Sequence, residues 1–151
     1  MWCRSSTMLG RRPPRVKAIA WIVCVASIGC FWRSYAPRMR THAEVMVSIA
    51  HKAVDLVATG RFTAESVPEL TYPLERAEAF ARQARERAGA DAPPSLARFD
   101  ELIARYRAFV DAVDRTRREQ RGADAAAALA GPLRAVEDAA TAVNEALRDE
   151  R

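Results

Sequence analysis

The residues of this chain best suited to metal or acid–base chemistry are its two histidines, His42 and His51. They are nine positions apart, and at about 3.6 residues per turn they lie half a turn from each other on a helix. They therefore cannot share one metal ion within a protomer. The chain shows no Ser-His-Asp, H-E-x-x-H or E-x-x-H pattern and no glycine-rich phosphate loop. We expect a protein that is not an enzyme and has no metal site.

The thiols are confined to the N-terminal thirty residues, as Cys3, Cys24 and Cys30, so the rest of the chain can form no disulfide. The sequence before Cys30, with Gly29 preceding the cysteine, resembles a bacterial lipobox, in which a small residue precedes a cysteine that is lipidated and becomes the new N-terminus. Ser27 stands where that motif usually has leucine. We predict lipidation at Cys30. Three alternatives remain open, which are an uncleaved anchor, ordinary cleavage after the small residues Ser27 and Gly29, and a buried core helix over residues 18–32.

A positive segment followed by an apolar one surrounds this cysteine. Residues 11–17 are rich in arginine, residues 18–32 carry no charge, and Arg33 ends the run. This is the pattern of a signal peptide or short anchor. As a helix, the uncharged run would rise about 22 Å, against a hydrocarbon core of about 30 Å. The positive flank places the N-terminus in the cytoplasm. We therefore expect an exported chain, anchored to membrane lipid and facing the periplasm or cell exterior.

The basic character of the chain belongs to this leader. Of the 24 basic side chains, five lie in residues 1–29, which hold no acid, so the remaining 19 balance the 19 acidic side chains of the rest. Nucleic-acid binding needs a clustered positive face. Because residues 30–151 are neutral overall, we expect no nucleic acid among the partners. A protein partner or a second copy of this chain remains possible.

Apolar residues at three- and four-residue spacing predict four helices after the leader. The first covers residues 38–60 and ends at Gly60. The second follows a capping-box pattern, Ser66 to Glu69, and ends at Gly89. The apolar positions of these two helices are Met39, Ala43, Met46, Ala50, Ala53 and Val57, with Ile49 and Leu56 beside them, and Leu70, Pro73, Leu74, Ala77, Phe80, Ala81, Ala84 and Ala88.

The third predicted helix starts at residues 91–95 and runs to about Arg121, and the fourth begins near Asp124, with a kink or break expected at Gly131-Pro132. Their apolar positions are Leu96, Phe99, Leu102, Ile103, Tyr106, Phe109, Val110 and Val113, and then Leu129, Leu133, Val136, Ala140, Val143 and Leu147. Opposite charges four residues apart mark the solvated faces, at Glu78–Arg82, Glu101–Arg105, Asp111–Arg115 and Asp114–Arg118.

Four amphipathic helices with short connections predict an all-α fold, an antiparallel up-down-up-down four-helix bundle. The expected division is a signal peptide or anchor over residues 1–30, a linker over residues 31–37 and the bundle over residues 38–151.

The layout resembles the cytochrome c-prime family in two segments. Residues 60–65, Gly-Arg-Phe-Thr-Ala-Glu, occupy the place of the family's link after its first helix, and residues 136–148 can be laid on its last helix. The family carries C-x-x-C-H there, whereas this chain has Ala140, Val143 and Asn144. The resemblance covers about 110 residues and implies the exported bundle fold, but it implies neither a covalent haem nor an axial ligand.

One weaker cofactor hypothesis rests on Met39, His42 and Met46, which share a helical stripe and could ligate a non-covalent haem. The simpler interpretation is packing, because methionine at helical spacing usually fills a core. We therefore predict no cofactor. The expected function is a non-enzymatic, membrane-tethered binding or structural module, and the alternative is a haem or small-ligand carrier of the cytochrome c-prime type.

Overall fold

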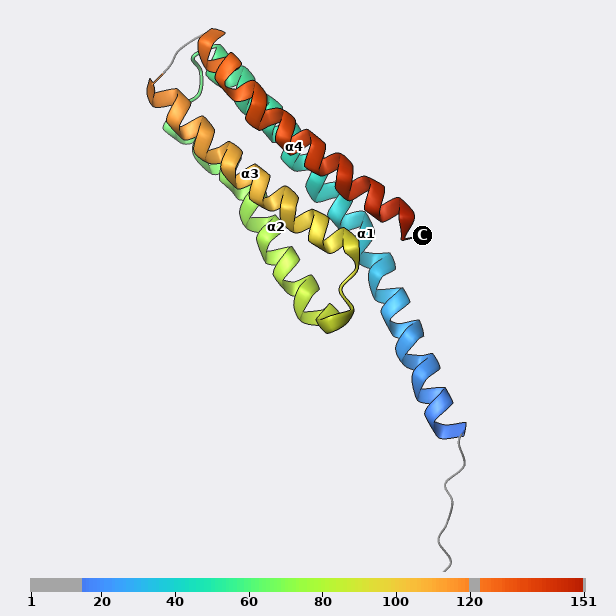
Figure 1. Cartoon of the computed structure of the whole chain (residues 1–151). Coiled ribbons are helices and arrows are strands. Elements are labelled where there is room, and N and C mark those ends of the chain that lie inside the picture. The colour runs from blue at the N-terminus through green and yellow to red at the C-terminus, as the bar shows by residue number, and fades with distance from the viewer. Residues whose placement is uncertain (1–14, 120–122, 151) are drawn as a thin grey trace, which may run out of the picture. The chain divides into compact units, whose positions relative to one another are not determined.

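The computed structural model describes the backbone of residues 15–119 and 123–150, and the side chains of residues 34–119 and 124–150. All regular structure in these ranges is helical, which confirms the predicted all-α class. The chain divides into two compact units, Met1–Arg33 and Ser34–Arg151. Figure 1 shows that α2, α3, α4 and the part of α1 in the second unit lie side by side.

The first helix, α1, spans Arg15–Ala58. It therefore includes the predicted linker, and Tyr35 within that linker is only 3 % exposed. Pro37 lies inside the helix, where its ring cannot donate a backbone hydrogen bond. Two residues after the last helical one, Gly60 has a φ of 69°, which is the left-handed conformation that glycine adopts without strain. The predicted end of the first helix is therefore confirmed.

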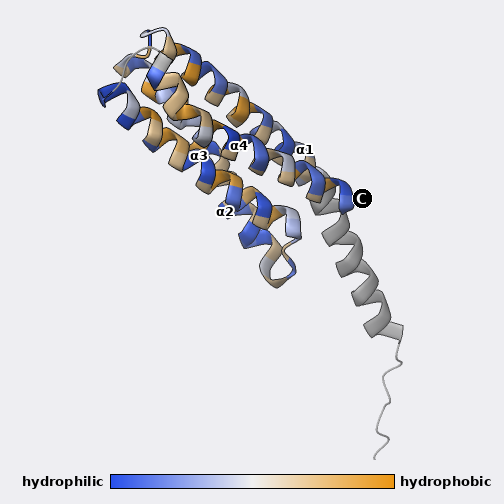
Figure 2. Ribbon diagram, turned by 45° about the horizontal axis from the view of Figure 1, so that its top comes forward, coloured by the Kyte–Doolittle hydropathy of each residue, from blue (hydrophilic) through white to orange (hydrophobic). Residues whose placement is uncertain are grey.

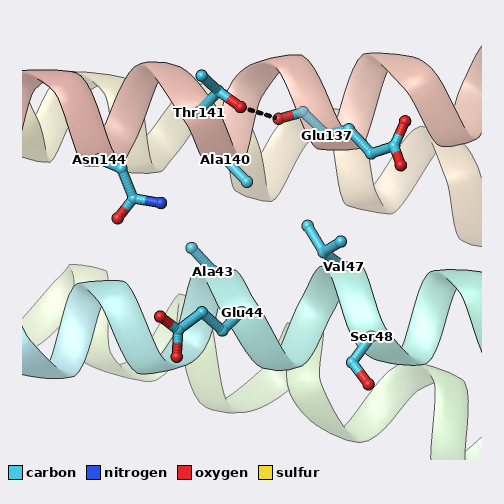
Figure 3. A pocket seen from close by; sticks show the side chains of 8 residues that line it. All are labelled: Ala43, Glu44, Val47, Ser48, Glu137, Ala140, Thr141 and Asn144. Atoms are coloured by element: carbon cyan, nitrogen blue, oxygen red, sulfur yellow. Dashed lines mark hydrogen bonds between the residues drawn. The ribbon is translucent and has the colours of Figure 1, made fainter.

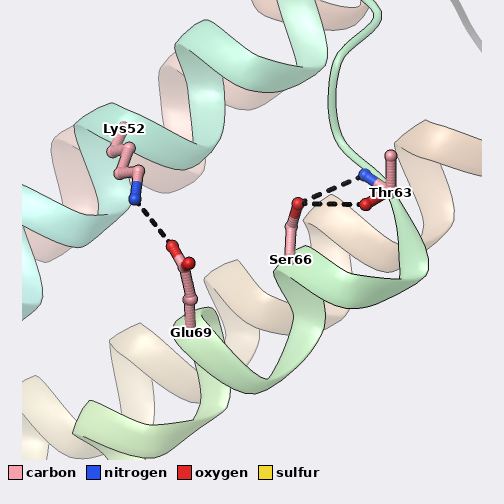
Figure 4. A network of polar contacts seen from close by, with 4 residues as sticks. All are labelled: Lys52, Thr63, Ser66 and Glu69. Carbon is pink, nitrogen blue, oxygen red and sulfur yellow. Dashed lines mark hydrogen bonds and ion pairs between the residues drawn. The ribbon is translucent and has the colours of Figure 1, made fainter.

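Polar contacts of Ser66 and Glu69 hold the connection to the second helix (Figure 4). Ser66 belongs to a short 3₁₀ helix, η1 (Ala64–Ser66), and its Oγ accepts a hydrogen bond of 3.3 Å from the Thr63 backbone N–H. Glu69 does not complete the predicted capping box with Ser66, because its carboxylate pairs with Lys52 Nζ of α1 at 2.6 Å. That prediction is wrong, since the interhelical ion pair takes the glutamate away from the helix end.

The second helix, α2, spans Val67–Ala88, and Pro73 lies within it as a buried residue. It ends at Gly89, whose φ is 59°, and the 3₁₀ helix η2 (Gly89–Asp91) leads onward. The third helix, α3, spans Pro94–Glu119. The predicted end near Arg121 lies outside the described residues.

The fourth helix, α4, spans Ala123–Asp149 without interruption. The kink or break predicted at Gly131-Pro132 does not end the helix, and Pro132 lies inside it. Proline here removes one hydrogen bond, to the carbonyl of Ala128. Because Ala128 and Gly131 are exposed, water can satisfy the freed carbonyl, and the buried seam on the other side of α4 holds the helix together.

The core is formed by one apolar face from each helix, and Figure 2 shows apolar and polar residues alternating along all four. Nearly all the predicted core positions are buried, including Met39 and Met46 on α1, Leu102 and Tyr106 on α3 and Val136 on α4, each 0 % exposed. Leu133 is the exception in the predicted α4 seam, because it is only partly buried. It lies next to Pro132 at the edge of the buried face.

Polar contacts join each pair of neighbouring helices on the described surface. They are Lys52–Glu69 between α1 and α2, Arg85–Asp100 and Arg107–Glu78 between α2 and α3, Ser95–Glu150 between α3 and α4, and His51–Glu137 between α1 and α4. The predicted pairs Glu101–Arg105 and Asp114–Arg118 are present. Glu78 instead contacts Arg107 of the next helix, so one predicted intrahelical pair is replaced by an interhelical one.

A search of the described residues for a helix long and apolar enough to cross a membrane finds none.

Candidate functional site

The most distinctive side-chain environment in the second unit surrounds His42 of α1. Its ring centroid lies 5.2 Å from that of Phe80 on α2 and 6.1 Å from that of Phe99 on α3. Tyr35 adds a fourth ring, 5.0 Å from Phe80, and Phe80 meets Phe99 edge to face at 5.7 Å. These distances are typical of packed aromatic pairs. Phe80 and Phe99 therefore hold one face of the imidazole against the core, and together with Tyr35 they form what we call the aromatic cluster.

The other side of His42 lines a surface hollow of about 620 Å³ between α1 and α2, which we call the arginine hollow. Its lining residues are Arg38 and His42 of α1 and Arg76, Ala79, Phe80, Arg82, Gln83 and Glu86 of α2. Burial lowers the pKa of His42, and the charge of Arg76 lowers it further. The imidazole is consequently neutral at pH 7, and the lining contains three positive charges and one negative charge.

The arginines of this hollow differ in their pairing from most of the arginines of α3. On α3, Arg105, Arg107 and Arg118 each form an ion pair with a carboxylate. Among residues 34–119 and 124–150, no ion pair joins Arg38, Arg76 or Arg82 to an acid, although Arg76 lies over the Tyr72 ring at 6.0 Å. Positive charge therefore gathers in the hollow, and the one acid of its lining, Glu86, forms no ion pair with these arginines in the described part of the chain.

A second hollow, of about 450 Å³, lies between α1 and α4 (Figure 3). Ala43, Glu44, Val47 and Ser48 line it from α1, and Glu137, Ala140, Thr141 and Asn144 line it from α4. Two of its five polar side chains make hydrogen bonds, since Thr141 Oγ1 donates to the Glu137 carbonyl at 2.9 Å and the Glu137 carboxylate accepts from His51. Asn144 Oδ1 is buried and has no hydrogen-bond partner in the described part of the chain. Both charged residues of this lining, Glu44 and Glu137, are acidic, so the hollow offers no cation to a ligand.

The structure separates the residues of the haem hypothesis. Met39 and Met46 are 0 % exposed and belong to the core, whereas His42 faces the arginine hollow. His51 lies elsewhere on α1, exposed, with its Nε2 2.9 Å from Glu137 Oε1. The expectation that the two histidines lie on different faces is therefore confirmed.

These residues do not fit a covalently attached haem. Val143 is 0 % exposed in the core, while Ala140 and Asn144 line the α1–α4 hollow, and none of the three carries a thiol or an imidazole. The methionine sulfurs could reach only a group placed inside the packed core, where aromatic rings already stand. His42 is the one residue of the proposed set that a ligand from solvent can approach.

No group of three or more histidine, cysteine, aspartate or glutamate side chains suited to a metal ion occurs within the described ranges. Among residues 34–119 and 124–150, the two buried polar residues are Ser95 and Thr116, both on α3. Ser95 is engaged with Glu150 through its N–H and its Oγ, at 2.7 Å each. The side chain of Cys30, the predicted lipidation site, lies outside the described residues.

Sequence reasoning found His42 but missed its arginine neighbours. Arg38, Arg76 and Arg82 look like ordinary surface positions of amphipathic helices, because nothing in a single sequence tells which helix faces pair. One signal was available. Arg38 and His42 are four residues apart, as are Arg76 and Phe80, so each helix places a cation and a ring on one stripe.

No protein-family model, curated protein or solved structure matches this chain. Its function is therefore inferred from its own residues.

Proposed function

We propose that this chain is an exported, membrane-tethered, non-enzymatic binding module, built as an antiparallel up-down-up-down four-helix bundle. The observation that carries the binding role is the arginine hollow, in which Arg38, Arg76 and Arg82 surround the neutral imidazole of His42 without an acid partner. Such convergent polar groups in a concave site are typical of ligand recognition. A tethered module with a surface hollow binds its ligand directly at the membrane face to which it is attached.

The interhelical contacts support the antiparallel arrangement. Lys52 near the end of α1 contacts Glu69 at the start of α2, and Ser95 at the start of α3 contacts Glu150 beyond the end of α4. Arg85 of α2 likewise contacts Asp100 of α3. Each contact joins the late part of one helix to the early part of another, as expected when short loops connect antiparallel neighbours.

The tether is supported by the sequence of the leader, where a basic segment precedes the uncharged residues 18–32 and Gly29 precedes Cys30. Metabolic acyl labelling, the intact mass and the accessibility of the body to protease in whole cells test it together. We expect lipid labelling that Cys30→Ala abolishes, and a body that is cleaved from outside. An unlabelled chain that keeps Met1 would replace the lipoprotein with an uncleaved anchor, and a protected body would refute export altogether.

The binding role is tested with the full-length chain in a neutral detergent, using small anionic, neutral and cationic fragments. The reporter is the NMR signal of the His42 imidazole. We expect at least one class of fragment to shift this signal to saturation in the wild-type chain and not in Arg76→Gln. If no fragment of any charge shifts it, the hollow is not a binding site for small soluble ligands.

A small-ligand carrier is the second candidate, and the position of His42 favours it. Burial and Arg76 lower the pKa of His42, so its imidazole is neutral, which is the form that binds iron. We expect no haem binding, because Met39 and Met46 are packed in the core and His42 alone would have to hold the macrocycle at the surface. A saturating one-to-one Soret shift on addition of ferric haem, abolished by His42→Ala, would overturn this expectation.

A further inference from the structure

We propose that the arginine hollow binds the phosphate group of a phosphate monoester. The inference rests on the proposed binding role and names the chemical class of its ligand. The carrying observation is that Arg38 of α1 and Arg76 and Arg82 of α2 line one hollow from two helices.

Arginine suits this task better than another cation. The guanidinium is a planar fork of N–H donors that remains charged at any working pH and matches the oxygens of phosphate in pairs. Arg38, Arg76 and Arg82 are exposed and form no ion pair with an acid in the described part of the chain, so a ligand need displace no carboxylate. Arg76 can keep its contact with the Tyr72 ring, because cation–π contact uses the face of the guanidinium.

The charge of the lining points to a dianion. Three arginines and Glu86 leave a net charge of +2, and the His42 imidazole adds none at pH 7. A phosphate monoester carries about −1.5 to −2 at this pH, whereas a carboxylate or a phosphate diester carries about −1. A monoester therefore neutralises the hollow, and Glu86 disfavours ligands that would bring further negative charge.

The floor of the hollow favours an ester over the bare ion. Phe80 and Ala79 contribute apolar surface beside the arginines, and His42 stands against Phe80 at a centroid distance of 5.2 Å. An apolar or aromatic substituent on the phosphate can lie on this floor while the phosphate meets the guanidinium groups. The same chemistry is offered by a soluble phosphate monoester and by the headgroup of phosphatidic acid in a membrane.

The test uses the full-length chain in neutral detergent at pH 7.5 with phenyl phosphate, benzoate and phenol, which share one ring and differ in charge. We expect phenyl phosphate to bind most tightly and phenol least. Because the bound dianion offsets the positive charge of Arg76, we also expect it to raise the pKa of His42, measured by NMR titration.

The variants separate a specific site from general attraction. Arg76→Gln and Arg82→Gln should each weaken phenyl phosphate binding about tenfold or more, since one charge-assisted contact is lost. Arg115→Gln on α3 changes the net charge equally but lies away from the hollow, so it should leave the affinity within about twofold. Arg76→Lys should restore binding in part, because it keeps the charge and loses the fork. Equal losses in Arg115→Gln and Arg76→Gln would overturn the proposal.

The series also distinguishes failure of this inference from failure of the binding role. If benzoate or phenol binds as tightly as phenyl phosphate and Arg76→Gln abolishes it, the hollow is a site but not one for phosphate monoesters. If none of the three compounds shifts the NMR signal of His42, binding of the chain is measured to phosphatidylcholine vesicles with and without phosphatidic acid. Arg76-dependent binding only with phosphatidic acid assigns the lipid headgroup as the source, and no binding in either arm overturns both proposals.

Discussion

A single buried hydroxyl links α3 to α2 through the core. Tyr106 Oη donates to the Leu70 carbonyl oxygen at 3.0 Å, and the Tyr106 side chain is fully buried. Burial raises the pKa of Tyr106, so the hydroxyl keeps its proton and remains a donor. The bond falls in the turn of α2 that precedes Pro73, where the proline leaves the Glu69 carbonyl without its helical donor.

Tyr106→Phe removes this bond and leaves the Leu70 carbonyl with one partner fewer in a dry environment. We expect the free energy of unfolding to fall by about 1–2 kcal/mol, measured by urea denaturation. Tyr72→Phe is the matched control, because Tyr72 is 61 % exposed and its ring, not its hydroxyl, faces Arg76. If both variants lose the same stability, the buried hydrogen bond is not the cause.

The half-buried imidazole of His42 predicts a pH dependence of stability. Burial, and then Arg76, lower its pKa from 6.5 in the folded chain. The unfolded chain therefore binds more protons than the folded chain between the lowered pKa and 6.5, and stability falls as the pH drops through that window. Above pH 6.5 this contribution is fully present, because the imidazole is neutral in both states.

His42→Phe keeps an aromatic ring in the cluster and removes the titration. Between pH 7.5 and 5, we expect the variant to lose less unfolding free energy than the wild type, as measured by urea denaturation at each pH. Parallel profiles for the wild type and His42→Phe would contradict the prediction.

At the scale of the helix, we expect substitution by alanine to have opposite effects on stability at two glycines. Gly131 lies within α4, and a Cβ added there meets no atom within 4 Å. Gly131→Ala should stabilise the chain by about 0.5–1 kcal/mol, because alanine loses less backbone entropy in a helix. Gly89, with a φ of 59° after α2, should instead give a loss of about 1 kcal/mol on change to alanine. Thermal unfolding of both variants gives the signs, and a loss at Gly131 would show that the helix is distorted there.

The start of α3 depends on a residue far along the chain. Glu150 accepts hydrogen bonds from the Ser95 N–H and the Ser95 Oγ, both at 2.7 Å, and so caps α3 from the end of α4. Glu150→Gln weakens these charge-assisted bonds and should cost about 1 kcal/mol. Asp149→Asn, which removes the neighbouring exposed charge, should cost little. Chemical denaturation of the two variants tests this, and an equal effect would assign the loss to net charge rather than to the cap.

The buried face of each helix could be predicted from the sequence, because apolar residues that recur with a period of about 3.6 residues lie on one side of a helix. Helix continuity and capping could not. Gly131 and Pro132 favour a break locally, yet packing of Val136, Val143 and Leu147 on one side holds α4 intact. Glu69 and Ser66 match a capping box, yet Lys52 of another helix takes the glutamate. In each case a contact between helices, which no local pattern records, outweighed the local preference.

At the scale of the whole molecule, the parts of the site that follow from one helix could be predicted, and the parts that depend on contacts between helices could not. The opposite facing of His42 and His51 follows from helix geometry alone, and the structure places them so. To predict the arginine hollow, one must know that α1 and α2 are neighbours and how each is rotated about its axis. Their rotation brings Arg38 and Arg76 into one lining. That setting is fixed by the aromatic cluster, whose rings come from three helices.

The aromatic cluster also fixes where the bundle begins. Tyr35 is 3 % exposed, and its ring centroid lies 5.0 Å from that of Phe80, although the sequence placed it in a linker. A fragment of residues 34–151 should therefore be helical and fold cooperatively, whereas a fragment of residues 37–151 loses one ring of the cluster. Removing a buried aromatic side chain costs about 3–5 kcal/mol. The free energy of unfolding of the shorter fragment should be lower by about this amount, reduced where the N-terminal end of α1 already frays in the longer fragment.

Urea denaturation of the two fragments, followed by circular dichroism, measures the difference. Tyr35→Ala within the 34–151 fragment is the matched variant, because it removes the ring and keeps the backbone of α1. We expect it to account for most of the loss seen in the 37–151 fragment. If the two fragments unfold at the same urea concentration, Tyr35 contributes nothing to the core and the bundle begins later, at Met39. In that case the setting of α1 against α2 would rest on the contacts of the His42 ring with Phe80 and Phe99.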